Sequence, residues 1–320
     1  MTLFHVNQEA DTLLRTIREE VFDKENRAVI AITGPQGAGK TERLLVTAAE
    51  AKERHVFYVY FDVTTKSPWI LRGLAGAFEK SAKDAGLIKM LGAPSWLRSL
   101  SSVAKSKDQS YDPKEAGRRI GEALNAAAPS LLLLNDLHNL VETREVEVFA
   151  KTLEEVTGVI KPGVLVMFTC YASYLAWLTA NQPAFASRVN RAITLATFSD
   201  DEARLVLAKK ILAKRIVEEL EPTYPFDREA VHELNRGARG NPRRLFELAD
   251  IVLEKAVALR AYQIDTELVH AALATRVVVE PESGEPWEEL SPDGAEPVPQ
   301  AKPTETETPS VRRSLFGRKR

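Results

Sequence analysis

The sequence predicts an α/β fold with a parallel sheet, followed by a small all-helical domain and a disordered C-terminal tail. Short apolar, β-branched runs alternate with helical patterns between residues 29 and 196, which is typical of a doubly wound sheet with right-handed crossovers. From Asp200 onward only helical patterns remain. Residues 280–309 are dense in Glu, Pro, Thr and Ser, and such a segment buries too little apolar surface to fold. We therefore expect an α/β domain over residues 1–198, a helical domain over 199–275 and a tail over 276–320.

Five segments have the composition of short strands. They are residues 29–33, 56–61, 131–134, 164–169 and 192–196. The third is a run of four leucines, which suits a central parallel strand that is buried on both faces.

Helical patterns fill the remaining intervals. In the first domain they cover residues 42–54, 69–87, 113–128 and 143–156. In the second domain they cover residues 200–219, 227–236, 242–261 and 265–274, and Asp200 and Asp227 are the predicted N-caps of two of these helices. Residues 95–112, rich in Ser and Lys, are predicted to be an exposed loop or a frayed helix.

Charge and cysteine content exclude several classes of protein. The 43 Lys and Arg against 45 Asp and Glu give a net charge of -2, which excludes both a surface that is basic throughout and an acidic disordered protein. A single cysteine, Cys170, excludes an internal disulfide and a cysteine-based metal site. The chain therefore fits a reducing compartment, and we expect it in the cytoplasm.

Residues 163–180 carry no charge and approach the length of a membrane span, which needs roughly 18 apolar residues. Thr169, Cys170 and Ser173 lie in the middle of this stretch, together with two tyrosines. We therefore expect a buried strand that continues into a helix, and no membrane partner.

The strongest motif is GPQGAGKT at residues 34–41, directly after the first predicted strand and before a predicted helix. It matches G-x-x-x-x-G-K-[ST], a phosphate-binding loop whose glycines let backbone N–H groups surround the phosphates. The positive end of the helix dipole adds to this attraction. The motif predicts a P-loop NTPase that uses ATP and Mg²⁺. The residues expected to bind the nucleotide are Gly34, Pro35, Gln36, Gly37, Ala38, Gly39, Lys40, Thr41 and Glu42.

Within this loop, Lys40 is expected to reach the β- and γ-phosphates and the Thr41 hydroxyl to ligate Mg²⁺. The alternative is a chance glycine turn, which the strand before and the helix after the loop make the weaker interpretation.

The leucine strand ends in Asn135 and Asp136. In P-loop ATPases an acid at the end of such a strand holds the Mg²⁺ shell, and many of these proteins have a second acid next to it. Here the first position is the uncharged Asn135, so Asp136 takes over the metal role or acts as a shortened general base. Either role predicts slow hydrolysis. The alternative is a core strand followed by a turn. His138, close by, either contacts the nucleotide site or is a turn residue with a satisfied hydrogen bond, and we expect the turn residue.

Three further polar residues are candidates for contact with the nucleotide. Thr169 ends the neighbouring strand and either faces the γ-phosphate or caps a turn. Arg188, in the segment SRVNR, either reaches a neighbouring subunit's nucleotide or is an ordinary surface charge, as Arg191 is. Arg243 lies in the first turn of a helix, where the dipole disfavours a base, so it fits a contact with an anion.

Taken together, these elements resemble an AAA+ ATPase. The branch that the sequence resembles holds the origin-recognition initiators of archaea and eukaryotes and the ExeA-like secretion and transposition ATPases. Three downstream segments carry the likeness to this branch: FSDDEA at 198–203, PFDREAV at 225–231 and RGNPRRL at 239–245. The resemblance covers residues from about 4 to 273.

The resemblance implies a role for each candidate. Lys40 and Thr41 would bind Mg-ATP, Thr169 would be the first sensor, Arg243 the second sensor and Arg188 an arginine finger. Asn135 departs from the family pattern, which puts fast hydrolysis in question but leaves binding intact.

Three functions remain open at this point. The first is an ATP-hydrolysing motor or remodeller that assembles with other copies or with a partner protein. The second is a switch that binds ATP, hydrolyses it slowly or not at all, and recruits a partner. The third is a DNA-linked loader or accessory ATPase. Initiators carry a winged-helix domain after the small helical domain. Residues 276–320 do not resemble one, so the sequence shows no domain that would recognise DNA.

The chain ends in basic residues around Leu315 and Phe316. Residues 311–320 are either the charged end of a solvated linker or a short docking motif on a tether.

Overall fold

A computed structural model of the chain describes residues 8–23, 26–63, 70–85, 112–142, 145–213 and 222–274. Several predictions lie outside these residues. They are the loop at 95–111, the end of the helix predicted to reach residue 219, and the tail with its basic end at 311–320.

A five-stranded parallel sheet forms the centre of the α/β part, in the order β2-β3-β4-β1-β5. The strands are β1 (Ala28–Thr33), β2 (Phe57–Asp62), β3 (Ser130–Asn135), β4 (Val164–Cys170) and β5 (Arg191–Thr194). The prediction of a parallel α/β fold is thus confirmed. Every residue of β1, β3 and β4 is buried, as expected for strands with a neighbour on each side and helices on both faces.

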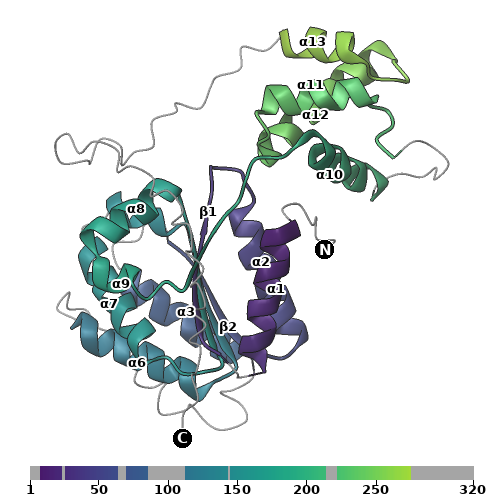
Figure 1. Cartoon of the computed structure of the whole chain (residues 1–320). Coiled ribbons are helices and arrows are strands. Elements are labelled where there is room, and N and C mark those ends of the chain that lie inside the picture. Colours follow the sequence, from purple (N-terminus) through teal and green to yellow (C-terminus); the bar gives the residue numbers. More distant parts are fainter. Residues whose placement is uncertain are drawn as a thin grey trace, which may run out of the picture. The chain divides into compact units, whose positions relative to one another are not determined.

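Helices cover both faces of this sheet (Figure 1). On one face lie α1 (Gln8–Phe22) and α2 (Lys40–Glu53). On the other lie α3 (Ile70–Asp84), α6 (Pro113–Ala126), α7 (Val146–Val159), α8 (Ala172–Asn181) and the short α9 (Pro183–Ala186). A 3₁₀ helix, η1 (Leu137–Glu142), follows β3.

Side-chain alternation along β1 explains the two layers. Val29 and Ala31 join the apolar core under α3, α6 and α7, whereas Ile30 and Ile32 join the core under α1 and α2. Residues 163–180 form the buried strand β4 followed by α8, as the sequence predicts. No helix among the described ranges is long and apolar enough to cross a membrane.

The chain after β5 is helical and has an apolar core of its own. Its helices are α10 (Asp200–Leu212), α11 (Arg228–Ala238), α12 (Pro242–Leu259) and α13 (Thr266–Ala274). Phe198 and Ile264 are buried in this second core.

The N-caps of these helices agree only in part with the prediction. Asp227 caps α11 by accepting a hydrogen bond from the Ala230 backbone. Asp200 does not cap α10. Ser199 does, through a capping box with Glu202, because the shorter hydroxyl side chain one residue earlier reaches the free N–H groups.

Candidate functional site

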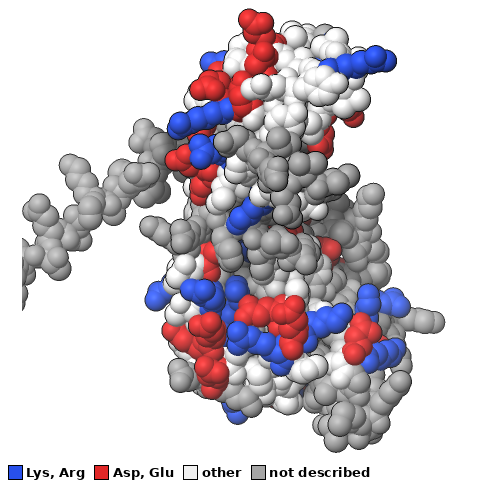
Figure 2. Space-filling model, turned by 90° about the vertical axis from the view of Figure 1, so that its right-hand side faces the viewer, with Lys and Arg blue, Asp and Glu red and all other residues white. Residues whose placement is uncertain are grey.

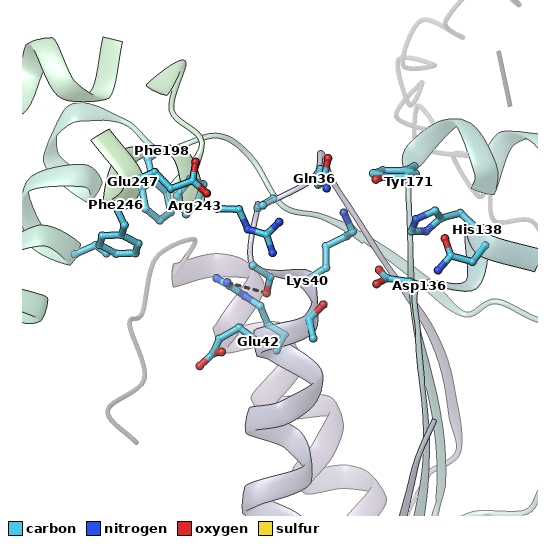
Figure 3. A pocket seen from close by; sticks show the side chains of 18 of the residues that line it. Gln36, Lys40, Glu42, Asp136, His138, Tyr171, Phe198, Arg243, Phe246 and Glu247 are labelled. Carbon is cyan, nitrogen blue, oxygen red and sulfur yellow. Dashed lines mark hydrogen bonds between the residues drawn. The ribbon is translucent and has the colours of Figure 1, made fainter. Parts of the chain in front are cut away.

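The site is a cavity of about 760 Å³ at the carboxyl edge of the sheet, lined by the phosphate loop, by the chain after β3 and β4, and by the start of α12 (Figure 3). Seven of the nine predicted nucleotide-binding residues line it: Gln36, Gly37, Ala38, Gly39, Lys40, Thr41 and Glu42. The other two, Gly34 and Pro35, supply carbonyl groups to Lys40 behind the lining.

Glycine is required in the loop for conformation and for space. Gly37 and Gly39 adopt φ angles of 80° and 88°, in the left-handed region that favours glycine. A Cβ atom on Gly37 would lie 2.5 Å from the Asn241 side-chain oxygen at the start of α12. A side chain at this position would therefore displace the Asn241 side chain, besides straining the backbone.

Lys40, the first residue of α2, is only 6% exposed. Its ammonium group donates hydrogen bonds of 2.7 and 2.9 Å to the carbonyls of Gly34 and Pro35. It also lies 4.6 Å from the centroid of the Tyr171 ring, a cation–π distance. Backbone carbonyls and an aromatic face thus hold this buried charge at the cavity.

The Thr41 hydroxyl donates a 3.0 Å hydrogen bond to the side-chain oxygen of Asn135. Asn135 is 5% exposed and joins the phosphate loop to the end of β3. The structure therefore brings these two predicted residues together, as the hypothesis of a P-loop site requires.

Asp136 lines the cavity directly after β3, in a left-handed backbone conformation with φ 54°. Asparagine and aspartate tolerate this conformation better than other residues with a side chain. Burial raises the pKa of its carboxyl group, and the nearby Lys40 ammonium opposes this effect. Its carboxylate and that of Glu42 are the two acids of the predicted set that line the cavity.

Thr169 is fully buried at the end of β4 and lies behind the lining. Its hydroxyl donates a 2.9 Å hydrogen bond to Asn135 and accepts a 2.7 Å hydrogen bond from the Asp136 backbone N–H. In this structure the hydroxyl thus fixes the two residues that end β3.

His138 and Tyr171 form an aromatic wall beside Asp136, with ring centroids 4.0 Å apart. Burial lowers the pKa of His138 to about 4, with a further contribution from the positive charge of Lys40. The expectation of a satisfied turn histidine is wrong, since the buried Nδ1 atom has no hydrogen-bond partner among the described residues. Packing against the tyrosine ring, which the sequence does not reveal, holds the imidazole instead.

Arg243 enters the cavity from the first turn of α12, together with Phe246 (Figure 3). The turn is placed by Asn241, whose side chain caps the Arg244 backbone N–H and donates a hydrogen bond to the Gln36 carbonyl of the phosphate loop. Lys40 and Arg243 thus reach one cavity from two different parts of the chain.

Arg188 lies elsewhere. Its guanidinium group packs over Gly158 of α7, 4.0 Å from the Glu154 carboxylate, and the side chain is 37% exposed. It does not line the cavity of its own chain.

Sequence reasoning missed three residues that shape the site. Tyr171 and Asn241 are described above, and Asp62 ends β2 and accepts a 2.9 Å hydrogen bond from the Asn135 amide. A signal for Asp62 existed, because a polar residue at the carboxyl end of a parallel strand lies at the edge where ligands bind.

Comparison with known proteins identifies the domain. Residues 23–168 match the family model described as an AAA domain. The chain carries an AAA domain. This agrees with the resemblance to AAA+ ATPases drawn from the phosphate loop and the strand ends, and it makes this part of the chain a nucleotide-binding ATPase module. No curated protein sequence matches the chain.

Solved structures share the fold of the AAA domain and of the helices after it. The Aeropyrum pernix ORC2 protein, solved with ADPNP and ADP, is 15% identical with a TM-score of 0.57, over 89% of this chain and 70% of that one. The Aeropyrum pernix ORC1 protein in complex with DNA is 16% identical with a TM-score of 0.52, over 86% and 66%. The Thermotoga maritima RuvB Holliday junction branch migration motor is 14% identical with a TM-score of 0.50, over 84% and 69%.

Proposed function

We propose that this AAA domain binds Mg-ATP in the cavity and couples the bound nucleotide to the helices that follow β5. The observation that carries the proposal is the convergence of Lys40 and Arg243 on one cavity. Two cations at opposite sides of a glycine loop, next to a helix N-terminus, suit a chain of phosphates. Figure 3 shows the Arg243 side chain extending toward the loop that carries Lys40.

The donor atoms at the loop fit Mg²⁺. Thr41 and Asp136 offer a hydroxyl and a carboxylate, the hard oxygen ligands that this ion prefers. The described residues contain no cluster of three or more acids, histidines or cysteines that would hold a metal alone. This suits an ion that is bound mainly by phosphate oxygens and water. When bound, the ion would neutralise the charge that develops on the phosphates.

Asp136 is the proposed acid of the hydrolytic reaction. As a carboxylate at the cavity wall it would either hold the metal shell or orient the attacking water. The Asn135 amide at the neighbouring position has no charge and does not accept a proton. We therefore infer slow turnover.

The helices over residues 199–275 are the proposed lid. Their separate apolar core supports a boundary near residue 198, and Asn241 joins α12 to the phosphate loop. A nucleotide held by Lys40 and Arg243 would favour a closed arrangement of these helices, which a partner protein would recognise.

Arg188 supports assembly with a second copy. Its partly exposed guanidinium lies outside its own cavity and makes a long, 4.0 Å ion pair with Glu154, so it would be accessible to another subunit's nucleotide. We therefore propose a homo-oligomer in which Arg188 completes the neighbouring site.

A switch with little or no hydrolysis is the second candidate, and the hydrogen bonds of Asn135 favour it. This side chain holds Thr41 and Thr169 in place without supplying a charge. A role on DNA remains the weaker alternative. On the face covered by α1 and α2, the described Lys and Arg side chains are interspersed with Asp and Glu (Figure 2), so these described residues do not form a basic track for a phosphate backbone.

Steady-state ATP hydrolysis with Mg²⁺ separates the first two candidates, with Lys40→Ala as background. Turnover above that background supports a hydrolysing motor or remodeller in which Asp136 suffices as the acid. Turnover at background together with retained ATP binding supports the switch. If the natural chain does not bind ATP, both candidates are refuted.

A further inference from the structure

The amide of Asn135 uses all four of its hydrogen-bonding positions. Its oxygen accepts from the hydroxyls of Thr41 at 3.0 Å and Thr169 at 2.9 Å. Its nitrogen donates to the carboxylates of Asp62 at 2.9 Å and Asp136 at 3.0 Å. An amide has two acceptor and two donor positions, so this side chain is fully satisfied.

The two carboxylates determine which way the amide faces. With the amide reversed, the Asn135 oxygen would face two acids that offer no proton when ionised. Either hydroxyl, by contrast, is able to donate or accept. Asp62 and Asp136 together thus direct the amide nitrogen to their side, which leaves the oxygen for the Thr41 hydroxyl beside the phosphate loop.

Strand pairing fixes Asp62 in this position. In the parallel register of β2 and β3, Asp62 lies opposite Asn135, and the Val63 backbone N–H donates a 3.0 Å hydrogen bond to the Asn135 carbonyl. The Tyr60 hydroxyl donates a 2.8 Å hydrogen bond to the same Asp62 oxygen that receives the amide. The acid is therefore held from both sides.

A carboxylate at position 135 would be incompatible with this arrangement. Three ionised acids would then meet at the ends of β2 and β3. Neither Asp62 nor Asp136 would receive a hydrogen bond from position 135. The structure instead places the two negative charges at positions 62 and 136, with an amide between them.

We propose that Asp62 is a positioning residue for the nucleotide site: it acts through the Asn135 amide to orient both the Asp136 carboxylate and the Thr41 hydroxyl. Asp62 does not line the cavity, so it touches neither phosphate nor metal in this assignment. The inference rests on the proposed nucleotide site. Its first test is nevertheless made on the ligand-free protein.

That test is a double-mutant cycle measured by urea unfolding of the full chain at pH 7.5. Asn135→Asp alone is expected to raise the unfolding equilibrium constant about tenfold, because the new carboxylate would face those of Asp62 and Asp136. Adding Asp62→Asn returns a donor amide to the pair and should recover at least half of the loss. The exposed acid at the end of α3 gives the matched control, Asp84→Asn, which should recover none.

The proposal would be overturned if the stability losses of Asn135→Asp and Asp62→Asn simply add in the double variant. It would also be overturned if Asp84→Asn restores as much stability to Asn135→Asp as Asp62→Asn does. If Asn135→Asp does not fold, the side-chain amide signal of Asn135 in ¹⁵N NMR spectra gives the answer. In Asp62→Asn this signal should shift and exchange faster with water, and an unchanged signal would contradict the assignment.

A readout with nucleotide separates positioning from a general loss of stability. Asp62→Asn should keep the dissociation constant of ATP measured without Mg²⁺ within about twofold and lower turnover with Mg²⁺ about fivefold, because the misplaced Thr41 hydroxyl and Asp136 carboxylate act on the metal and on the attacking water. Unchanged turnover would refute the role of Asp62. If the natural chain shows no turnover, the affinity for Mg²⁺ in the presence of ATP is measured instead. Asp62→Asn should lower this affinity about fivefold, because the Thr41 hydroxyl is no longer held in place. An absence of ATP binding by the natural chain would refute the proposed function and leave the unfolding cycle valid.

Discussion

The ammonium group of Lys40 lies 4.6 Å from the centroid of the Tyr171 ring, and Figure 3 shows Tyr171 and Arg243 on either side of Lys40. Tyr171 packs in turn against His138, so one aromatic ring supports both the cation of the phosphate loop and the imidazole beside Asp136. A buried ammonium needs such support, because it has lost most of its contact with water.

Replacing Tyr171 should therefore affect ATP binding through the ring rather than through the hydroxyl. Tyr171→Phe keeps the aromatic face and should leave the ATP dissociation constant within about twofold. Tyr171→Leu removes the face and should weaken binding about two- to fivefold, the size of one cation–π contact. Isothermal titration calorimetry on both variants measures this, and equal affinities for Phe and Leu would contradict the support that we assign to the ring.

The neighbouring arginines at the start of α12 offer a matched pair. Arg243 lines the cavity, whereas Arg244 does not. Arg243→Ala should weaken ATP binding about tenfold or more, as expected for losing a charge-assisted contact to phosphate, whereas Arg244→Ala should change it less than twofold. Equilibrium binding of a fluorescent ATP analogue compares the two. A larger effect from Arg244→Ala would show that the phosphate contact is assigned to the wrong arginine.

Gly37 should not tolerate a side chain. Gly37→Ala combines a left-handed backbone with a Cβ atom 2.5 Å from Asn241, so it should destabilise the protein by about 1–3 kcal/mol and separate the loop from α12. Gly76→Ala, in α3 with open space around the new methyl group, is the control and should stabilise by about 0.5–1 kcal/mol. Urea unfolding measures both. A stable Gly37→Ala protein that binds ATP normally would show that the close approach is not required.

His138 should make stability depend on pH in a defined window. Its pKa is about 4 in the folded chain and 6.5 in an unfolded one, so the unfolded state binds the proton first as pH falls. Stability is then full above pH 6.5 and falls between pH 6.5 and pH 4, by roughly 1–2 kcal/mol after allowance for partial exposure.

His138→Asn should flatten the dependence of stability on pH over this interval. The control is His55→Asn, which replaces an exposed histidine just after α2. Thermal unfolding between pH 4 and pH 7 compares the two slopes. The raised pKa of Asp136 acts in the opposite sense, since it lowers stability as pH rises above 3.8. A slope that persists without His138 would assign the titration to another group.

Much of the fold could be predicted because buried parallel strands are continuous apolar runs. Each of the five predicted strands is found, with ends that differ by one or two residues. Helix α1 was not among the predicted helices, since its segment is amphipathic but carries no motif. Its place depends on contacts such as the 3.4 Å ion pair between Asp11 and Arg43 of α2.

The candidate site divides in the same way. The loop around Lys40 follows a local motif, so its residues could be named from spacing alone. The links from Asn135 to Asp62 and from Asn241 to Gln36 join distant parts of the chain, and they depend on strand register and on the packing of α12. The polar end of a predicted strand marks Asp62 as a residue near the site, but a single sequence does not show which side chains these residues contact.

The central claim, that the cavity around Lys40 holds Mg-ATP, is tested most directly by one calorimetric titration. ATP with Mg²⁺ is titrated into the natural chain, Lys40→Ala and Lys52→Ala, the last an exposed lysine at the end of α2, after all three are shown to unfold at similar temperatures. We predict one site in the natural chain, about 100-fold weaker binding in Lys40→Ala, and less than a twofold change in Lys52→Ala. Equal binding by Lys40→Ala and the natural chain would contradict the account.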